Sequence, residues 1–182
     1  MEWQQFKYFQ TLARTQHMTR AAVALCVLLG PALPASAQPT QGERTFSGSW
    51  SATGQQETIA TEGIRAASTV RLSGSLVLTG GSGLSRGFRG EAIGFDDGAA
   101  VRLGRSVWTD DRGDRIFSEL RGELLEKGRR WIGTITGGSG RYAHMSGEYE
   151  LTWQYVIRTE DGAFQGRAAD LKGRFRLSSA SP

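Results

Sequence analysis

Cysteine, histidine and proline are scarce in this chain: its 182 residues include one cysteine, two histidines and four prolines. A single cysteine excludes an internal disulfide framework and a cysteine-rich metal site. Only His144 lies beyond the first 37 residues, so that part of the chain has no pair of histidines for a metal. No nucleophile elbow accompanies His144 either. We therefore expect no metal and no cofactor, and we interpret His144 as a surface or turn residue.

A large excess of one charge is also lacking. The chain has 22 Lys and Arg residues against 18 Asp and Glu residues, which gives a formal net charge of +4. Because both signs are interspersed along the sequence, the composition does not require a nucleic-acid partner. Glycine is abundant instead, with 25 residues, about twice the usual ~7%. A hydrophobic content of 38% excludes a wholly disordered chain.

The longest apolar run, 21–29, has the features of a secretory signal peptide. Arg20 precedes the run, and the small residues Ala-Ser-Ala follow at 35–37. The run is shorter than the ~20 apolar residues that a membrane-spanning helix needs. We predict a helical signal peptide over 18–37, cleavage before Gln38, and export to the periplasm or the medium. We expect no stable membrane insertion after processing.

Residues 1–17 do not fit a signal peptide, so we interpret them as an extraneous extension or as the product of a misassigned start, with Met18 the initiator. Residues 1–22 resemble the first helix of LysR-type transcription regulators. Where that family has polar residues facing DNA, this chain has Val-Leu-Leu-Gly at 27–30. A helix without hydrogen-bond donors cannot read base edges. We therefore expect no nucleic-acid partner, and a DNA-binding fragment is only our third hypothesis.

From Thr45 onward, short strand-like runs alternate with turn signals such as Asp97-Gly98 and Asp161-Gly162. Glycines also occur about once within each run, where they allow the bending of a small barrel. The pattern predicts an all-β fold, a closed antiparallel barrel of about eight strands over 45–178, between a flexible leader (38–44) and a short tail (179–182). The runs are 45–53, 56–61, 68–79, 86–96, 99–109, 114–125, 129–136, 145–158 and 163–178.

Aromatic residues are the first candidates for a binding site. In the last but one run, apolar residues alternate with polar ones from Tyr149 to Ile157, so the aromatic side chains share one face of the sheet. The sequence does not decide whether that face points inward, nor whether the aromatic residues line a cavity or form a packed core. The candidate ligand-binding residues are Trp108, Trp131, Tyr149, Trp153 and Tyr155, with Trp50, Phe88 and Phe117 as further members of the set.

Charged residues give a second set of candidates. Glu119, Arg121 and Glu123 share one face of their run, because alternate residues of a strand point the same way. Facing the interior, Glu119 or Glu123 could serve as a general acid. Facing solvent, the three would form an ion-pair row that adds little stability. Both interpretations are open from the sequence.

The most distinctive motif is Gly-Ser-Gly-Arg-Tyr-Ala at 138–143, followed by Gly147 and a strand. This corner resembles that of the bacterial relatives of allene oxide cyclase and of dirigent-type barrels, a resemblance that spans about 45–178. It implies an eight-stranded barrel with an interior cavity. It does not imply the cyclase reaction, because the catalytic residues of the plant enzyme cannot be matched to this chain.

The same corner supports three structural predictions. Gly138 or Gly140 should have a positive φ, because the chain must reverse there without Pro or Asn. Arg141 should be a surface residue, and Tyr142 should pack over the end of the barrel. We interpret the glycines as a structural turn and not as a phosphate site, because a P-loop needs a Lys and a following helix.

Two functions from different classes follow. The first is an exported barrel that binds a small apolar or aromatic molecule in its interior. The alternative is a cyclase or isomerase that acts on an unsaturated fatty-acid derivative, with Glu119 and Glu123 as weak candidates for catalysis. A structural role without any ligand also stays open, and the sequence does not predict the oligomeric state.

Overall fold

The computed structural model describes residues 42–61, 63, 66–99, 101–125 and 129–178. The predicted extension, signal peptide and tail, and the first part of the predicted leader, lie outside the described residues.

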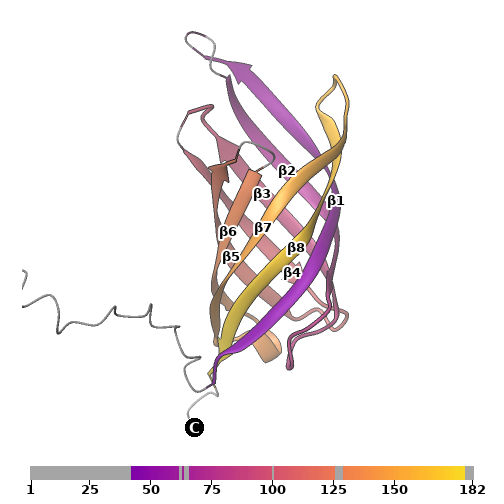
Figure 1. Cartoon of the computed structure of the whole chain (residues 1–182), viewed down its shortest axis with the longest axis vertical. Helices are drawn as coiled ribbons and strands as arrows, with labels where there is room; N and C mark the ends of the chain where they lie inside the picture. Colours follow the sequence, from indigo (N-terminus) through magenta and orange to yellow (C-terminus); the bar gives the residue numbers. More distant parts are fainter. Residues whose placement is uncertain (1–41, 62, 64–65, 100, 126–128, 179–182) are drawn as a thin grey trace, which may run out of the picture. The chain divides into compact units, whose positions relative to one another are not determined.

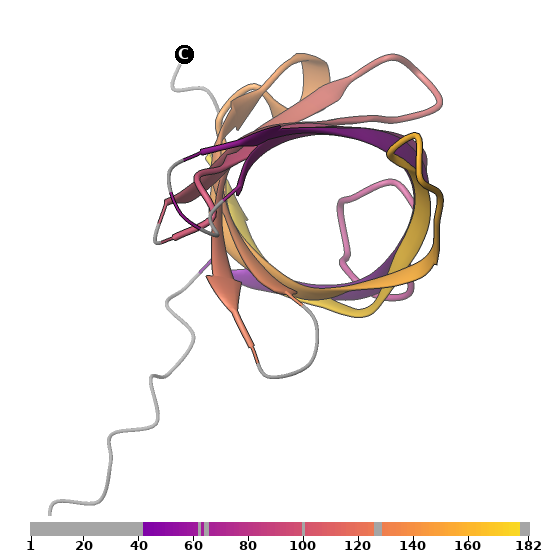
Figure 2. The same cartoon turned by 90° about the horizontal axis from the view of Figure 1, so that it is seen from above.

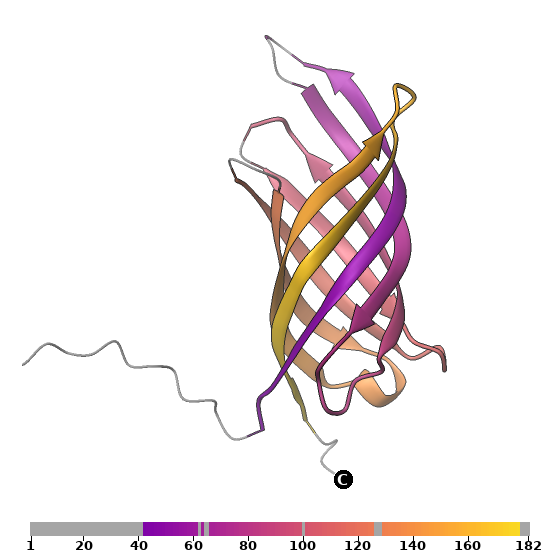
Figure 3. The ribbon, with the colours of Figure 1, turned by 45° about the vertical axis from the view of Figure 1, so that its right-hand side comes forward.

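Eight strands form a closed barrel in which each strand pairs antiparallel with the next and the last pairs with the first (Figure 1). The predicted all-β barrel is therefore confirmed. Figure 3 shows the first and last strands running side by side, where they close the barrel. The strands are β1 (Arg44–Ala60), β2 (Ala66–Leu78), β3 (Gly87–Asp96), β4 (Arg102–Thr109), β5 (Arg115–Leu124), β6 (Arg129–Gly138), β7 (Met145–Arg158) and β8 (Ala163–Leu177), and a short 3-10 helix, η1 (Gly140–Tyr142), precedes β7.

One predicted turn is absent: the runs 45–53 and 56–61 form a single strand, β1. Gly54, between them, pairs with Leu72 of β2 instead of reversing the chain. A Cβ at Gly54 would lie 2.4 Å from the carbonyl oxygen of Arg71 and 2.6 Å from the ring of Phe164. The glycine is therefore needed for close approach within the barrel, and the sequence pattern mistook it for a turn.

Interior glycines also make room for aromatic rings. A Cβ at Gly133 would lie 2.1 Å from Cζ of Tyr149, and one at Gly166 would lie 2.4 Å from Cζ2 of Trp153. Each ring thus lies close to the glycine of a neighbouring strand. At these two positions the glycine and the aromatic residue depend on each other, because a larger side chain in place of the glycine would not fit.

The barrel has two different ends. The odd-numbered strands finish at the end that we call the mouth, and Figure 2 looks into the ring of strands from that side. Helix η1 lies at the opposite end, the base (Figure 1). The base half is filled by side chains that are at most 4% exposed; we call this set the base core: Phe46, Leu76, Trp108, Ile116, Tyr142, Tyr149 and Phe175.

Candidate functional site

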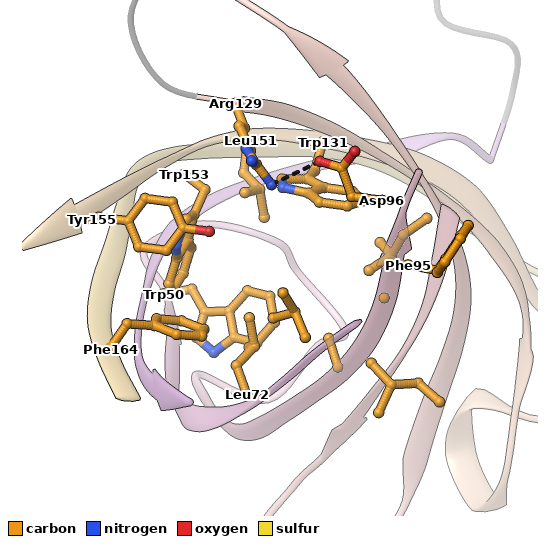
Figure 4. Close-up of a pocket in the computed structure, with 15 residues that line it drawn as sticks. Trp50, Leu72, Phe95, Asp96, Arg129, Trp131, Leu151, Trp153, Tyr155 and Phe164 are labelled. Carbon is orange, nitrogen blue, oxygen red and sulfur yellow. Dashed lines mark ion pairs between the residues drawn. The ribbon is translucent and has the colours of Figure 1, made fainter. Parts of the chain in front are cut away.

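A cavity of about 50 Å³ lies inside the barrel, on the mouth side of the base core (Figure 4). This is room for roughly three to five water molecules, or for one small organic group. The cavity takes its walls from strands all around the barrel, and nearly all of these side chains are apolar. Its principal lining residues are Trp50, Leu72, Ala92, Trp131, Leu151, Trp153, Tyr155 and Phe164.

A chain of aromatic rings forms one wall of the cavity. The ring centres of Trp50 and Trp153 are 5.8 Å apart, with an angle of 67° between the planes. Phe164 then contacts Trp153 at 6.5 Å and Tyr155 at 5.3 Å, in both cases nearly edge to face. Such arrangements stabilise aromatic pairs beyond the effect of burial alone. The wall is therefore preorganised, and Figure 4 shows it on the side of the cavity away from Asp96.

Three of the five candidate ligand-binding residues line this cavity: Trp131, Trp153 and Tyr155. Trp108 and Tyr149 instead belong to the base core, with their ring centres 4.6 Å apart and exposures of 0% and 2%. The aromatic residues therefore line a cavity in the mouth half of the barrel and form a packed core in the base half. The alternation in β7 is directed inward from Tyr149 to Trp153, because these side chains are buried whereas Glu148 is exposed.

The wider set of aromatic residues divides in the same way. Trp50 lines the cavity, and Phe88 is buried beside Trp108 with ring centres 6.0 Å apart. Phe117 is wrong as a cavity residue, because it lies on the outer face of β5 and is 36% exposed. Phe164 is a lining residue that the sequence analysis missed. A signal for it was present in the sequence: Phe164 is two residues before Gly166, so the two residues share one face of their strand.

One polar contact is buried beneath the cavity, in the base core. The hydroxyl groups of Tyr149 and Ser106 are 2.8 Å apart, and either can donate the hydrogen bond. Burial raises the pKa of the Tyr149 phenol above its usual value. The phenol is therefore neutral at physiological pH, and its hydrogen bond satisfies a polar group inside the packed half of the barrel.

Charged residues meet the cavity at its mouth. Arg102 donates from Nε to Oδ2 of Asp96 at 2.9 Å, and Nη1 of Arg129 lies 3.1 Å from the same oxygen. The side chains of Asp96 and Arg102 are only 9% and 7% exposed, and that of Arg129 is 25% exposed. We call these three residues the mouth cluster; Figure 4 shows the ion pair of Asp96 and Arg129 at the edge of the cavity.

Glu119 and Glu123 do not face the cavity. They lie on the outside of β5, with side chains 56% and 42% exposed. Glu119 forms an ion pair with Arg105, and Glu123 lies 4.0 Å from both Arg121 and Arg130. Glu119, Arg121 and Glu123 therefore form an ion-pair row that faces solvent, which was one of the two interpretations left open by the sequence. The cyclase alternative therefore has no candidate acid at these two positions.

The Gly-rich corner closes the base. Gly140 has a φ of 55°, whereas Gly138 has no positive φ. Tyr142 is fully buried, and its hydroxyl donates to Oδ2 of Asp110 at 3.0 Å. Arg141 is exposed, as predicted, but it is not free, because its Nε donates to the same oxygen at 3.0 Å. Sequence spacing gave no signal for this, because Asp110 is 31 residues away.

The carboxyl of Asp110 is surrounded by donors. Burial by itself would raise its pKa, but hydrogen bonds from the side chains of Arg141 and Tyr142 and from two backbone N–H groups lower the pKa below its usual value. The carboxylate is thus charged over the physiological range. It fixes the corner to the loop between β4 and β5 and is a structural group at the base, remote from the mouth.

The described part of the chain has neither a cluster of metal-ligating side chains nor an apolar helix long enough to cross a membrane. No group of three or more His, Cys, Asp or Glu residues is placed there so that it could hold a metal ion. No helix in the described residues has the length and hydrophobicity to cross a membrane.

Comparison with known proteins gives likeness at the level of the fold alone. No family model matches the chain, and no curated protein matches it in sequence. Among solved structures, the pterocarpan synthase dirigent protein GePTS1 is similar with a TM-score of 0.47 and 12% identity, over 83% of this chain and 99% of that chain. This neighbour is also an eight-stranded barrel. A similarity at this level carries no argument about activity, and kinship with the allene oxide cyclase relatives stays a prediction.

Proposed function

We propose that the barrel binds a small apolar or aromatic molecule in the cavity on the mouth side of the base core. The observation that carries the proposal is the contrast between the two halves of the interior. Large side chains fill the base half, whereas a similar number of aromatic rings in the other half leave a cavity of about 50 Å³. Cavities with a mainly apolar lining can take up apolar molecules, and the lining of this cavity is mainly apolar.

The size of the cavity limits the ligand. A volume of about 50 Å³ is smaller than the roughly 150 Å³ of a cavity that encloses a benzene ring, so part of the ligand must extend toward the mouth. Very small ligands gain at most about 1.5 kcal/mol per non-hydrogen atom. A ligand of roughly six to ten such atoms therefore has enough contacts for micromolar affinity.

The test is a calorimetric titration with toluene, a neutral molecule with one ring. We expect saturable binding to the unmodified chain. Ala92, which is 8% exposed and lines the cavity, gives the informative variant. Ala92→Leu fills the space with three extra carbon atoms and should weaken binding at least about tenfold, the effect of losing ~1.4 kcal/mol. Ser75→Leu, on the exposed outer face of β2, adds a similar volume outside and should leave binding unchanged.

Two results of the toluene titration would contradict the proposed function. If toluene does not bind to a chain that melts cooperatively, or if both variants bind it like the parent, the cavity is not a ligand site. The barrel would then be a structural or partner-binding module.

We also propose that the barrel acts after export. The apolar run at 21–29 and the small residues at 35–37 support this proposal. Intact-mass measurement of the protein from the periplasm or the medium tests it, with a mature N-terminus at or near Gln38 expected. A full-length mass in the cytoplasm would contradict export and would revive the DNA-binding hypothesis.

A further inference from the structure

The apolar cavity adjoins a polar hollow at the mouth of the barrel. Asp96 and Arg129 line both spaces, so the two spaces adjoin at this ion pair. The remaining polar side chains of the hollow are neutral donors and acceptors, with one further guanidinium. They are Gln56, Thr58, Ser68 and Arg102.

The mouth cluster has more positive than negative charge. Both guanidinium groups approach the same oxygen, Oδ2 of Asp96. The other carboxylate oxygen, Oδ1, accepts a hydrogen bond from the backbone N–H of Gly98 at 2.8 Å. Among the described residues that line the hollow, Asp96 is the only acid. Arginine does not lose its proton in a protein, so one positive charge has no acidic partner among the described residues of the hollow.

The surroundings make this charge significant. Arg102 is almost fully buried, and its only hydrogen bonds among the described residues go to Asp96 and, from Nη1, to the carbonyl oxygen of Ala99 at 3.3 Å. These bonds use two of its five N–H donors. Within the described part of the chain, Arg129 has only its ion pair with Asp96, and a quarter of its side chain is exposed. A charge at an apolar boundary attracts a counter-ion more strongly than one in water, because the effective dielectric constant is lower.

We infer that the ligand is an amphipathic anion: a carboxylic acid with one ring or a short chain, whose carboxylate pairs with Arg129 and Arg102 while its apolar end enters the cavity. This inference rests on the proposed function and adds the class of ligand to it. The planar guanidinium fork matches a carboxylate in shape. One carboxylate also balances the single excess charge, whereas a phosphate monoester carries about 1.5 to 2 negative charges at neutral pH.

The experiment compares four molecules with one ring each, titrated into the full chain by calorimetry: benzoate, benzamide, toluene and phenyl phosphate. We expect benzoate to bind at least about tenfold more tightly than benzamide, because hydrogen bonds to charged groups are the stronger ones. Rising salt concentration should weaken the binding of benzoate and leave that of toluene nearly unchanged. This salt measurement needs no variant, so it does not depend on the folding of one.

Two variants place the effect at the mouth. Arg129→Gln should remove the preference for benzoate over benzamide. Arg121→Gln is the matched control, because Arg121 is on the outer face of β5 with a side chain 71% exposed. It should keep the full preference.

The possible failures are distinguishable. If toluene binds but benzoate and benzamide bind equally, the inference about the anion is overturned and the proposed function stands. If phenyl phosphate binds more tightly than benzoate, the assignment of a carboxylate is wrong. If none of these molecules binds, the proposed function fails and this inference fails with it.

Discussion

The guanidinium of Arg141 and the hydroxyl of Tyr142, consecutive residues of the Gly-rich corner, donate to one oxygen of Asp110, each at 3.0 Å. The side chain of Asp110 has no exposed surface, so this carboxylate depends on its protein donors. The contact joins the segment before β7 to the loop after β4 and closes the base of the barrel.

The first prediction concerns this contact. Arg141→Ala should lower the free energy of unfolding by about 1–3 kcal/mol, because it removes a charged donor from a buried acceptor. The value is at the lower end of what a fully buried pair would give, since Arg141 is itself 35% exposed. Urea denaturation measures the change, with Arg112→Ala, at an exposed position of the loop, as the control. Equal stability of the two variants would show that Asp110 does not need Arg141.

The second prediction is a dependence on pH. The pKa of Asp110 is lowered in the folded protein, so its contribution to stability is complete above the unfolded-state pKa of ~3.9 and is lost as the pH falls through the lower, folded-state pKa. The stability difference between the parent and Asp110→Asn should therefore be constant from pH 7 to about pH 5 and shrink below about pH 4. Denaturation curves at several pH values provide the comparison. A difference that grows on acidification would contradict the assignment.

The third prediction separates two glycines. Gly140 has a φ of 55°, and a Cβ there would lie 1.8 Å from Oδ1 of Asp114. Gly140→Ala should therefore destabilise the barrel by about 1–3 kcal/mol. Gly87 has ordinary φ and no atom within 4 Å of a Cβ, so Gly87→Ala should be neutral or slightly stabilising. Thermal melts of both variants decide the matter, and a neutral Gly140→Ala would mean that the corner adapts freely.

The fourth prediction tests the pairing of glycine with aromatic rings. Gly133→Ala introduces a methyl group 2.1 Å from Cζ of Tyr149 and should cost about 1–3 kcal/mol through overpacking. Tyr149→Leu is itself destabilising, but in its presence the alanine should cost much less. A double-mutant cycle measures this coupling. Additive effects would show that the two residues do not constrain each other.

The sequence predicted the barrel because its strands have strong local signals. Alternation from Tyr149 to Trp153 marks one strand, and dipeptides such as Asp161-Gly162 mark the hairpins. The sense of the alternation required the structure, because a period of two is the same for an inward and an outward aromatic face. The false turn at Gly54 arose because a glycine for close packing and a glycine for chain reversal look alike in one sequence.

The site was predictable only in part. Trp131, Trp153 and Tyr155 were identified as aromatic residues on strands, but nothing in the sequence separates them from Trp108, which lies in the base core. That division depends on how far along the barrel each residue lies, which is set by the register of all eight strands. The mouth cluster was missed for a related reason. Its members come from β3, β4 and β6, and each resembles an ordinary solvated charge in its own segment.

Occupancy of the cavity is tested most directly by NMR, through the indole N–H signals of the five tryptophans during a titration with toluene. Trp50, Trp131 and Trp153 line the cavity, whereas Trp108 is fully buried in the base core and serves as an internal control. We expect the signals of the three lining residues to shift with one common dissociation constant, and that of Trp108 to shift much less. No saturable shift, or equal shifts at Trp108 and the three lining tryptophans, would contradict a ligand site in the mouth half of the barrel.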